Sequence, residues 1–158
     1  MPHPRMFDDD DPQLARVREI ALGFPGAAEK ISHGRPVFFT TKVFTHYGWL
    51  RRHGDWQDWR SQPRTVVVLP DADERAALLQ DERCFHPAYL GPSGWVAFEL
   101  PAARAAKRHW AEVAELIDAS YRNTAGKRLI AELDARLTHR PRKRAPARSR
   151  SAVCSSAG

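Results

Sequence analysis

The period of the hydrophobic pattern changes twice along this chain, and that change restricts the possible folds more than any other feature of the sequence. Close to the N-terminus, four apolar residues recur at the spacing of one helix face: Leu14, Val17, Ile20 and Ala21. Asp11 and Pro12 suit the N-cap and first turn of a helix, and Gly23 and Pro25 end it. We therefore predict a first helix over residues 12–22.

The middle of the chain is rich in β-branched and aromatic residues, which favour strands. Gly34, the pair Thr40–Thr41 and Pro70 divide this region into short segments. The predicted strands cover residues 29–33, 36–40, 42–50 and 65–69, with a last strand through Trp95, Ala97 and Glu99. A short helix capped by Asp71 or Asp73 comes before that last strand.

Helical spacing returns in the final third of the chain. Five residues form one apolar stripe: Trp110, Val113, Ala114, Ile117 and Tyr121. Leu129, Leu133 and Leu137 continue the stripe after a break at Asn123 and Thr124. Strands placed between helices from the two ends of the chain predict an α+β fold, in which a twisted antiparallel sheet has the N-terminal and C-terminal helices packed on one face.

The second face of such a sheet is expected to be half open to water, because an antiparallel sheet tolerates solvent on one side. Alternation along the strands assigns residues to the two faces. Ile31, Phe39 and Phe44 are expected to face the helices. The residues expected to face water are Lys30, Ser32, Thr40, Lys42 and His46. This open face and its hairpin tips are the predicted binding surface.

Two segments have a residue order specific enough to indicate a family. The first runs from Pro25 to Phe44 and contains His33, Gly34, Arg35 and Pro36 in succession. The second follows Pro87 and contains Tyr89, Leu90, Gly91, Gly94, Trp95 and Val96, with Lys127, Arg128 and Leu129 further on. On these residues the chain resembles the MmcQ/YjbR family over roughly residues 12 to 137. The resemblance implies a single CyaY-like domain and, from the DNA-binding label in the family's name, a nucleic-acid function in bacteria.

Length and composition fit one domain with its own core. No apolar run reaches the roughly 18 residues that a membrane span needs, and the acidic start lacks the pattern of a secretory signal. We predict a cytoplasmic protein, most simply a monomer. Its parts are expected to be a disordered acidic leader over 1–11, the domain over 12–137, and a disordered basic tail over 138–158.

The net charge of +6 comes from the predicted tail. Six of the 25 Lys and Arg residues lie from Arg140 onward, which leaves 19 against the 19 Asp and Glu residues of the chain. A mobile basic tail attracts polyanions without sequence preference, or serves only as a solubilising extension. A basic face on the neutral body would therefore have to arise from how its charges are arranged.

Two parts of the body suit contact with nucleic acid. Arg35, raised on a hairpin turn, would bind a phosphate, or else form a surface ion pair with Glu29. Residues 49–64 alternate three tryptophans with basic residues, as a surface that stacks bases and holds phosphates would, although the same tryptophans also suit packing over the sheet. The predicted nucleic-acid contacts are Lys30, Arg35, Lys42, Arg52, Trp56, Arg64, Lys127 and Arg128.

No motif in the sequence indicates catalysis, a cofactor or a metal site. The histidines lack the short spacing of zinc ligands, and the run Asp8–Asp11 suits solvation as well as it suits a divalent cation. His33, His86 and Tyr89 would gather near the glycine turns, where structural roles suffice for them. Besides nucleic-acid binding, two alternatives stay open: a protein-interaction module and a small-molecule or metal-binding domain.

Overall fold

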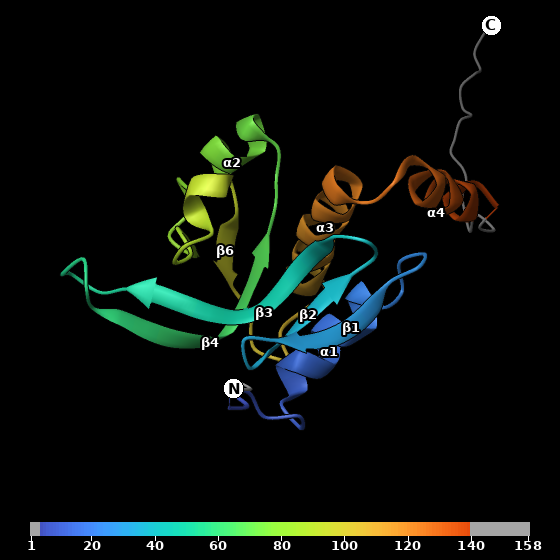
Figure 1. Ribbon diagram of the computed structural model, residues 1–158. Helices are drawn as coiled ribbons and strands as arrows, with labels where there is room; N and C mark the ends of the chain where they lie inside the picture. The colour runs from blue at the N-terminus through green and yellow to red at the C-terminus, as the bar shows by residue number, and fades with distance from the viewer. Residues whose placement is uncertain (1–3, 140–158) are drawn as a thin grey trace, which may run out of the picture.

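The computed structural model describes residues 4–139, in which helices enclose a run of strands (Figure 1). Its helices are α1 (Pro12–Ala21), α2 (Ala72–Leu78), the 3-10 turn η1 (Gly91–Ser93), α3 (Lys107–Thr124) and α4 (Lys127–His139). Its strands are β1 (Ala28–Ser32), β2 (Arg35–Phe39), β3 (Val43–Arg52), β4 (Trp59–Val68), β5 (Cys84–Phe85) and β6 (Val96–Glu99). The order of elements agrees with the prediction, apart from β5 and η1, which were not predicted.

All six strands belong to one sheet, with the spatial order β1-β2-β3-β4-β6-β5 and antiparallel pairing between neighbours. The first four strands form a meander, and α2 and β5 intervene before β6 pairs with β4. Strand β4 begins at Trp59, six residues before the predicted start, so the β3–β4 hairpin extends well beyond the rest of the sheet (Figure 1). These features confirm the predicted α+β fold.

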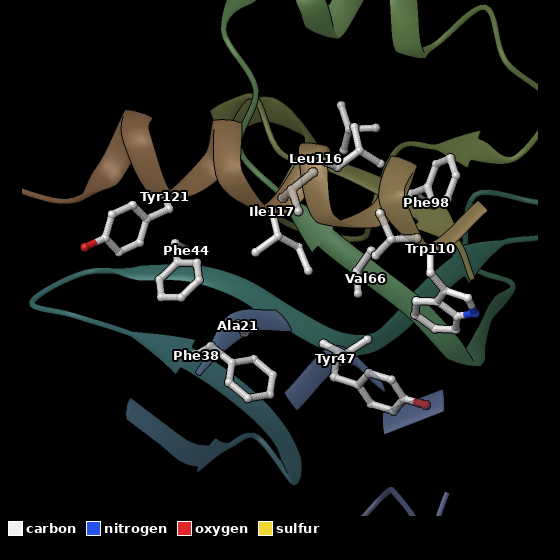
Figure 2. Packing of buried hydrophobic residues seen from close by; sticks show 14 of the residues in the cluster. Ala21, Phe38, Phe44, Tyr47, Val66, Phe98, Trp110, Leu116, Ile117 and Tyr121 are labelled. Carbon is white, nitrogen blue, oxygen red and sulfur yellow. The ribbon is translucent and has the colours of Figure 1, made fainter. Parts of the chain in front are cut away.

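Helices α1 and α3 cover one face of the sheet, as predicted, and the main core lies between them and β2, β3, β4 and β6. Figure 2 shows Ile117 and Tyr121 of α3 pointing toward Phe44 and Val66 of the sheet. Trp110 at the start of α3 is only 3% exposed, and its indole N–H donates to the Ala102 carbonyl at 2.9 Å. The predicted apolar stripe therefore forms the buried side of α3.

The N-cap of α1 links this helix to the sheet. The Asp11 carboxylate accepts the Gln13 backbone N–H at 2.9 Å, which is the predicted capping bond. Its second oxygen accepts the hydroxyl of Tyr47, on β3, at 2.6 Å. Ser120 makes a similar link from α3, because its hydroxyl donates to the Phe44 carbonyl at 2.5 Å. These bonds fix both helices on the same face.

The second face of the sheet carries a separate apolar cluster, made of Trp49, Val67, Phe85, Ala88 and Ala97. It forms because the chain from β5 to β6 crosses this face instead of leaving it to solvent. The expectation that His46 faces water is therefore wrong: His46 is 9% exposed, between the rings of Trp49 and Trp95 at 5.1 Å each.

Ile31 is on the predicted face, because its pairing with Pro36 puts it on the same side of the sheet as Phe38, but no helix covers it and it is 51% exposed. The helices pack mainly over β3, and Ile31 lies on β1, at the edge of the sheet. Phe44, in contrast, is fully buried on the helix side, as expected.

The leader contacts the domain from the first described residues. The Met6 N–H donates to the Gly34 carbonyl at 2.8 Å, and Asp9 pairs with Arg18 at 2.6 Å. The predicted basic tail lies, from residue 140 onward, outside the described residues. None of the helices within residues 4–139 combines the length and hydrophobicity that a membrane crossing requires.

Candidate functional site

A pocket of about 590 Å³ lies on the second face of the sheet, beside the β1–β2 turn. The turn, the middle of β3, the loop before η1 and the leader each contribute to its wall. The lining residues are Met6, Ser32, His33, Arg35, His46, Trp49, Leu50, Tyr89 and Leu90. Most of them are apolar or aromatic, and among the described residues that line the pocket none is acidic. This composition is typical of a small-molecule site with a few polar groups.

The β1–β2 turn sets the position of Arg35. His33 and Gly34 have φ of 53° and 82°, the left-handed pair of a two-residue hairpin turn. Such a tight turn pairs Ser32 directly with Arg35, which becomes the first residue of β2. Arg35 therefore does not project from the hairpin tip as predicted: its side chain lies along the sheet and is only 5% exposed.

The buried Arg35 side chain crosses β3 at Gly48. Gly48 has φ of 78°, and a Cβ atom placed there would lie 3.5 Å from both Cδ and Nε of Arg35. Beyond Gly48, Arg35 Nη2 is 3.4 Å from the Ser61 hydroxyl oxygen of β4, which is a long hydrogen bond. The guanidinium carbon lies 5.8 Å from the centre of the Trp49 ring. The glycine thus provides the space in which the arginine reaches the pocket.

No negative charge accompanies this arginine. Within residues 4–139 no carboxylate forms an ion pair with Arg35, and its Nε has no hydrogen-bond partner. The alternative ion pair with Glu29 does not form, because Glu29 pairs with Arg18 at 2.9 Å. Burial lowers the pKa of Arg35 from its ordinary value, since the charged form loses hydration. Arg35 is thus a desolvated cation to which the described part of the chain supplies no counterion.

His46 is a second buried polar group in the pocket wall. Burial lowers its pKa to about 4, and the nearby His33 acts in the same direction. The ring is therefore neutral near pH 7, and its Nδ1 has no hydrogen-bond partner. His46 supplies a hydrogen-bonding group there without adding a second charge.

The loop before η1 forms the opposite wall. The Trp49 indole N–H donates to the Ala88 carbonyl at 2.7 Å, which fixes the loop on β3. The next residue, Tyr89, has φ of 64° and is 77% exposed, with its ring stacked on Trp59 at 6.1 Å. A left-handed conformation is uncommon for a tyrosine and is often found at ligand sites. Tyr89 therefore forms an accessible aromatic rim.

A smaller hollow of about 330 Å³ lies on the other side of this rim. Arg51, Arg52, Trp59 and His86 are among its lining residues. Glu99 pairs with Arg51 at 3.1 Å, whereas the Arg52 guanidinium lies 5.9 Å from the centre of the Trp59 ring. His86 therefore belongs to this hollow, while His33 and Tyr89, its companions in the sequence analysis, line the larger pocket.

The structure distributes the predicted nucleic-acid contacts over several elements. Arg52 and Trp56 share the end of the β3–β4 hairpin, where Trp56 is 68% exposed. Lys127 and Arg128 lie in the first turn of α4, at the opposite end of the molecule in Figure 1. The remaining exposed cations are Lys30 on β1, Lys42 between β2 and β3, and Arg64 on β4. Lys30 lies 4.5 Å from the ring of Phe39, and Arg128 lies 4.0 Å from Glu132.

Sequence reasoning missed His46, Trp49 and Gly48 as parts of one site. The alternation of β3 assigned His46 to the open face, but it contains no information on which later segment covers that face. Gly48 inside an apolar strand indicates a bulge or a close backbone approach, and the β3–β4 register does shift between Tyr47 and Trp49. That glycine was the feature from which the crossing arginine could have been anticipated.

Comparisons with known proteins agree with the fold. The family model described as YjbR matches residues 22–123, more than half of the chain. A crystal structure of the Deinococcus radiodurans protein DR2400, with a domain of type DUF419, superposes with a TM-score of 0.52 at 18% identity, over 78% of this chain and 90% of that chain. Among curated proteins there is no match. The sequence resemblance is thus confirmed, and the chain belongs to the YjbR family.

Proposed function

We propose that this protein binds a small anion in the pocket beside Arg35. The observation that carries the proposal is Arg35 itself, a residue that is only 5% exposed, has an unpartnered Nε and forms no ion pair within the described residues. Buried charges in proteins are normally paired, because an isolated ion in an apolar environment is strongly unfavourable. An anion entering this pocket would supply the missing partner.

The energetics favour a binding role over a structural one. A buried arginine that stabilises a fold does so through an ion pair and several hydrogen bonds. Within residues 4–139, Arg35 has one side-chain hydrogen bond, at 3.4 Å to Ser61, and its guanidinium carbon lies 5.8 Å from the centre of the Trp49 ring. The unliganded protein therefore bears a desolvation penalty, and a bound anion would recover part of it. One chain contributes every described residue of the wall, so we propose that the monomer binds.

Anion-dependent stabilisation tests this proposal. Thermal unfolding is measured for the wild type and for Arg35→Met in a panel of carboxylates and phosphates at constant ionic strength. A ligand present at 100 times its Kd stabilises the native state by about 2.7 kcal/mol. We expect at least one anion to raise the Tm of the wild type and to leave Arg35→Met unchanged. Equal shifts in both proteins, or none in either, would reject the site.

Binding of single-stranded nucleic acid is a second candidate, favoured by the exposed aromatic residues of the β3–β4 hairpin. Trp56 is 68% exposed, and the stacked pair Trp59 and Tyr89 adjoins the hollow that Arg52 lines. Bases stack on such rings, and arginines beside them hold phosphates. The DNA-binding label of the family adds to this proposal. A basic face that covers the whole sheet receives less support, because the candidate cations lie on separate elements.

Salt-dependent binding of a labelled oligothymidine separates this candidate from attraction by the tail. The oligonucleotide is titrated with the full chain, with a chain ending at Leu137, and with Arg52→Ala and Trp56→Ala variants. The candidate predicts that the shorter chain still binds and that each substitution weakens binding, with a smaller salt slope for Arg52→Ala. Binding by the full chain alone would assign all affinity to the tail.

A further inference from the structure

We infer that the ligand of the Arg35 pocket is a flat aromatic monocarboxylate. This inference rests on the proposed function and specifies the chemical class of the anion. It follows from three properties of the wall: its number of positive charges, the hydrogen-bond donors that are free, and the shape and polarity of the remaining surface.

The charge of the wall matches one negative charge. Among the described lining residues Arg35 is the only Lys or Arg and none is acidic, and the titratable groups beside it are His33, His46 and Tyr89. His46 adds no second positive charge near neutral pH, because burial holds its ring neutral. A carboxylate neutralises Arg35 one for one. A phosphate monoester, with a charge near −2, would leave an excess negative charge in a mostly apolar site, which is unfavourable.

The available donors also match a carboxylate. The guanidinium presents its N–H groups as a planar fork, and two parallel hydrogen bonds to the two oxygens of a carboxylate are its preferred geometry. Nε of Arg35 is unpartnered, and Nη2 makes only the 3.4 Å contact with Ser61. Both groups belong to the same edge of the fork, and at Nη2 a carboxylate oxygen competes only with a long bond. Nε is closed to solvent beside Gly48, so a second bond to it requires the Arg35 side chain to move toward the pocket.

The rest of the wall suits an aromatic body. Trp49, Tyr89 and His46 present rings to the pocket, and Met6, Leu50 and Leu90 present aliphatic surface. Aromatic rings pair favourably with one another by stacking or by edge contacts, so these walls select a flat ligand. A volume of about 590 Å³ lies within the range of small-molecule pockets and accommodates a fused two-ring acid.

Isothermal titration with four probes tests the class. The probes are 2-naphthoate, its neutral analogue 2-naphthamide, acetate and inorganic phosphate, so that charge and ring are varied separately. The proteins are the full-length wild type, Arg35→Lys, Arg35→Met and the matched control Arg108→Met, which removes an exposed arginine of α3 outside the pocket. Circular dichroism verifies that each variant is folded.

We expect the wild type and Arg108→Met to bind 2-naphthoate equally, Arg35→Lys to bind it at least tenfold more weakly, and Arg35→Met to show no binding. Acetate and 2-naphthamide should each bind at least tenfold more weakly than 2-naphthoate. Arg35-dependent binding of phosphate in preference to 2-naphthoate would overturn the aromatic carboxylate and leave the anion site standing. Unchanged 2-naphthoate binding by Arg35→Met, or no binding of any probe to the wild type, would overturn both.

Discussion

At the level of single residues, Arg35 shows how far local sequence determines a site. The succession His33, Gly34, Arg35 correctly indicates a tight turn, and from a turn alone an exposed arginine is the natural expectation. The side chain is instead 5% exposed, because Gly48 on the neighbouring strand leaves room for it to cross. This contact joins β2 and β3 at the bulge in β3. The hydrophobic pattern of either strand alone does not show which side chain lies at that bulge.

The absence of a counterion leads to a prediction about stability. Arg35→Met keeps a side chain of similar length and removes the buried charge, so it should raise the free energy of unfolding of the unliganded protein by on the order of 1 kcal/mol. Urea unfolding at pH 7 measures the change. Arg108→Met, at an exposed site, should stay within about 0.5 kcal/mol of the wild type. A loss of stability in Arg35→Met would identify the arginine as a structural element.

His46 predicts a pH dependence of stability. Its pKa is about 4 in the folded protein and 6.5 ordinarily, so between these values the unfolded chain binds a proton that the folded protein does not. The stability from neutral His46 is thus complete above pH 6.5 and decreases as the pH falls toward 4, by up to about 3 kcal/mol. Urea unfolding of His46→Phe should show a smaller decrease over this window, whereas His86→Gln, an exposed control, should follow the wild type. Parallel curves for all three proteins would refute the assignment.

At the level of elements, most of the fold could be predicted from the sequence. Features that depend only on neighbouring residues in the sequence were predicted correctly, such as the Asp11 N-cap of α1 and the apolar stripe of α3. The length of the β3–β4 hairpin was not predicted. Strand β4 begins at Trp59 because polar residues beyond the core still pair with β3. Nor was the cover over the second face predictable, since it requires knowing that the chain after β5 returns across the sheet.

Two glycines allow the close packing of Pro63 and Arg35 on Gly48 of β3 to be measured. Gly48→Ala should lower the free energy of unfolding by about 1–2 kcal/mol, because it adds a Cβ at positive φ that would lie 3.3 Å from the Pro63 carbonyl oxygen and 3.5 Å from Arg35. Gly54, at the hairpin tip, has φ of 71°, and a Cβ atom added there would meet no described atom within 4 Å. Gly54→Ala therefore reports the backbone contribution alone, about 1 kcal/mol. Chemical denaturation compares the two variants, and equal losses would mean that neither Pro63 nor Arg35 packs closely on Gly48.

Helix α3 provides the corresponding test of the main core. Trp110→Ala should lower the free energy of unfolding by about 3–5 kcal/mol, because a nearly buried indole and its bond to Ala102 are lost. Trp56→Ala, which removes a 68% exposed indole, should change it by less than about 0.5 kcal/mol. Thermal and urea unfolding of both variants give the comparison. A large loss in Trp56→Ala would show that the hairpin tip packs against the body.

At the level of the whole molecule, the sequence predicted the balance of charge but not its arrangement. Carboxylates pair with many of the described arginines: Arg5, Arg18, Arg51, Arg60, Arg83, Arg122, Arg128 and Arg136. Most of these pairs are exposed and contribute little to stability, yet they neutralise cations that would otherwise attract a polyanion. Arg35 differs from these residues in being buried, at 5% exposed, and in forming no ion pair within residues 4–139.

The most direct measurement of the central claim is the proton–nitrogen resonance of the Arg35 Nε–H group, assigned by its absence in Arg35→Met and followed as 2-naphthoate is added. An unpartnered N–H that gains a carboxylate should move downfield and exchange more slowly with water, while the Nε–H of Arg108 stays in place. A resonance that does not change at saturating 2-naphthoate, phosphate or acetate would contradict the account, because the buried guanidinium would then receive no anion.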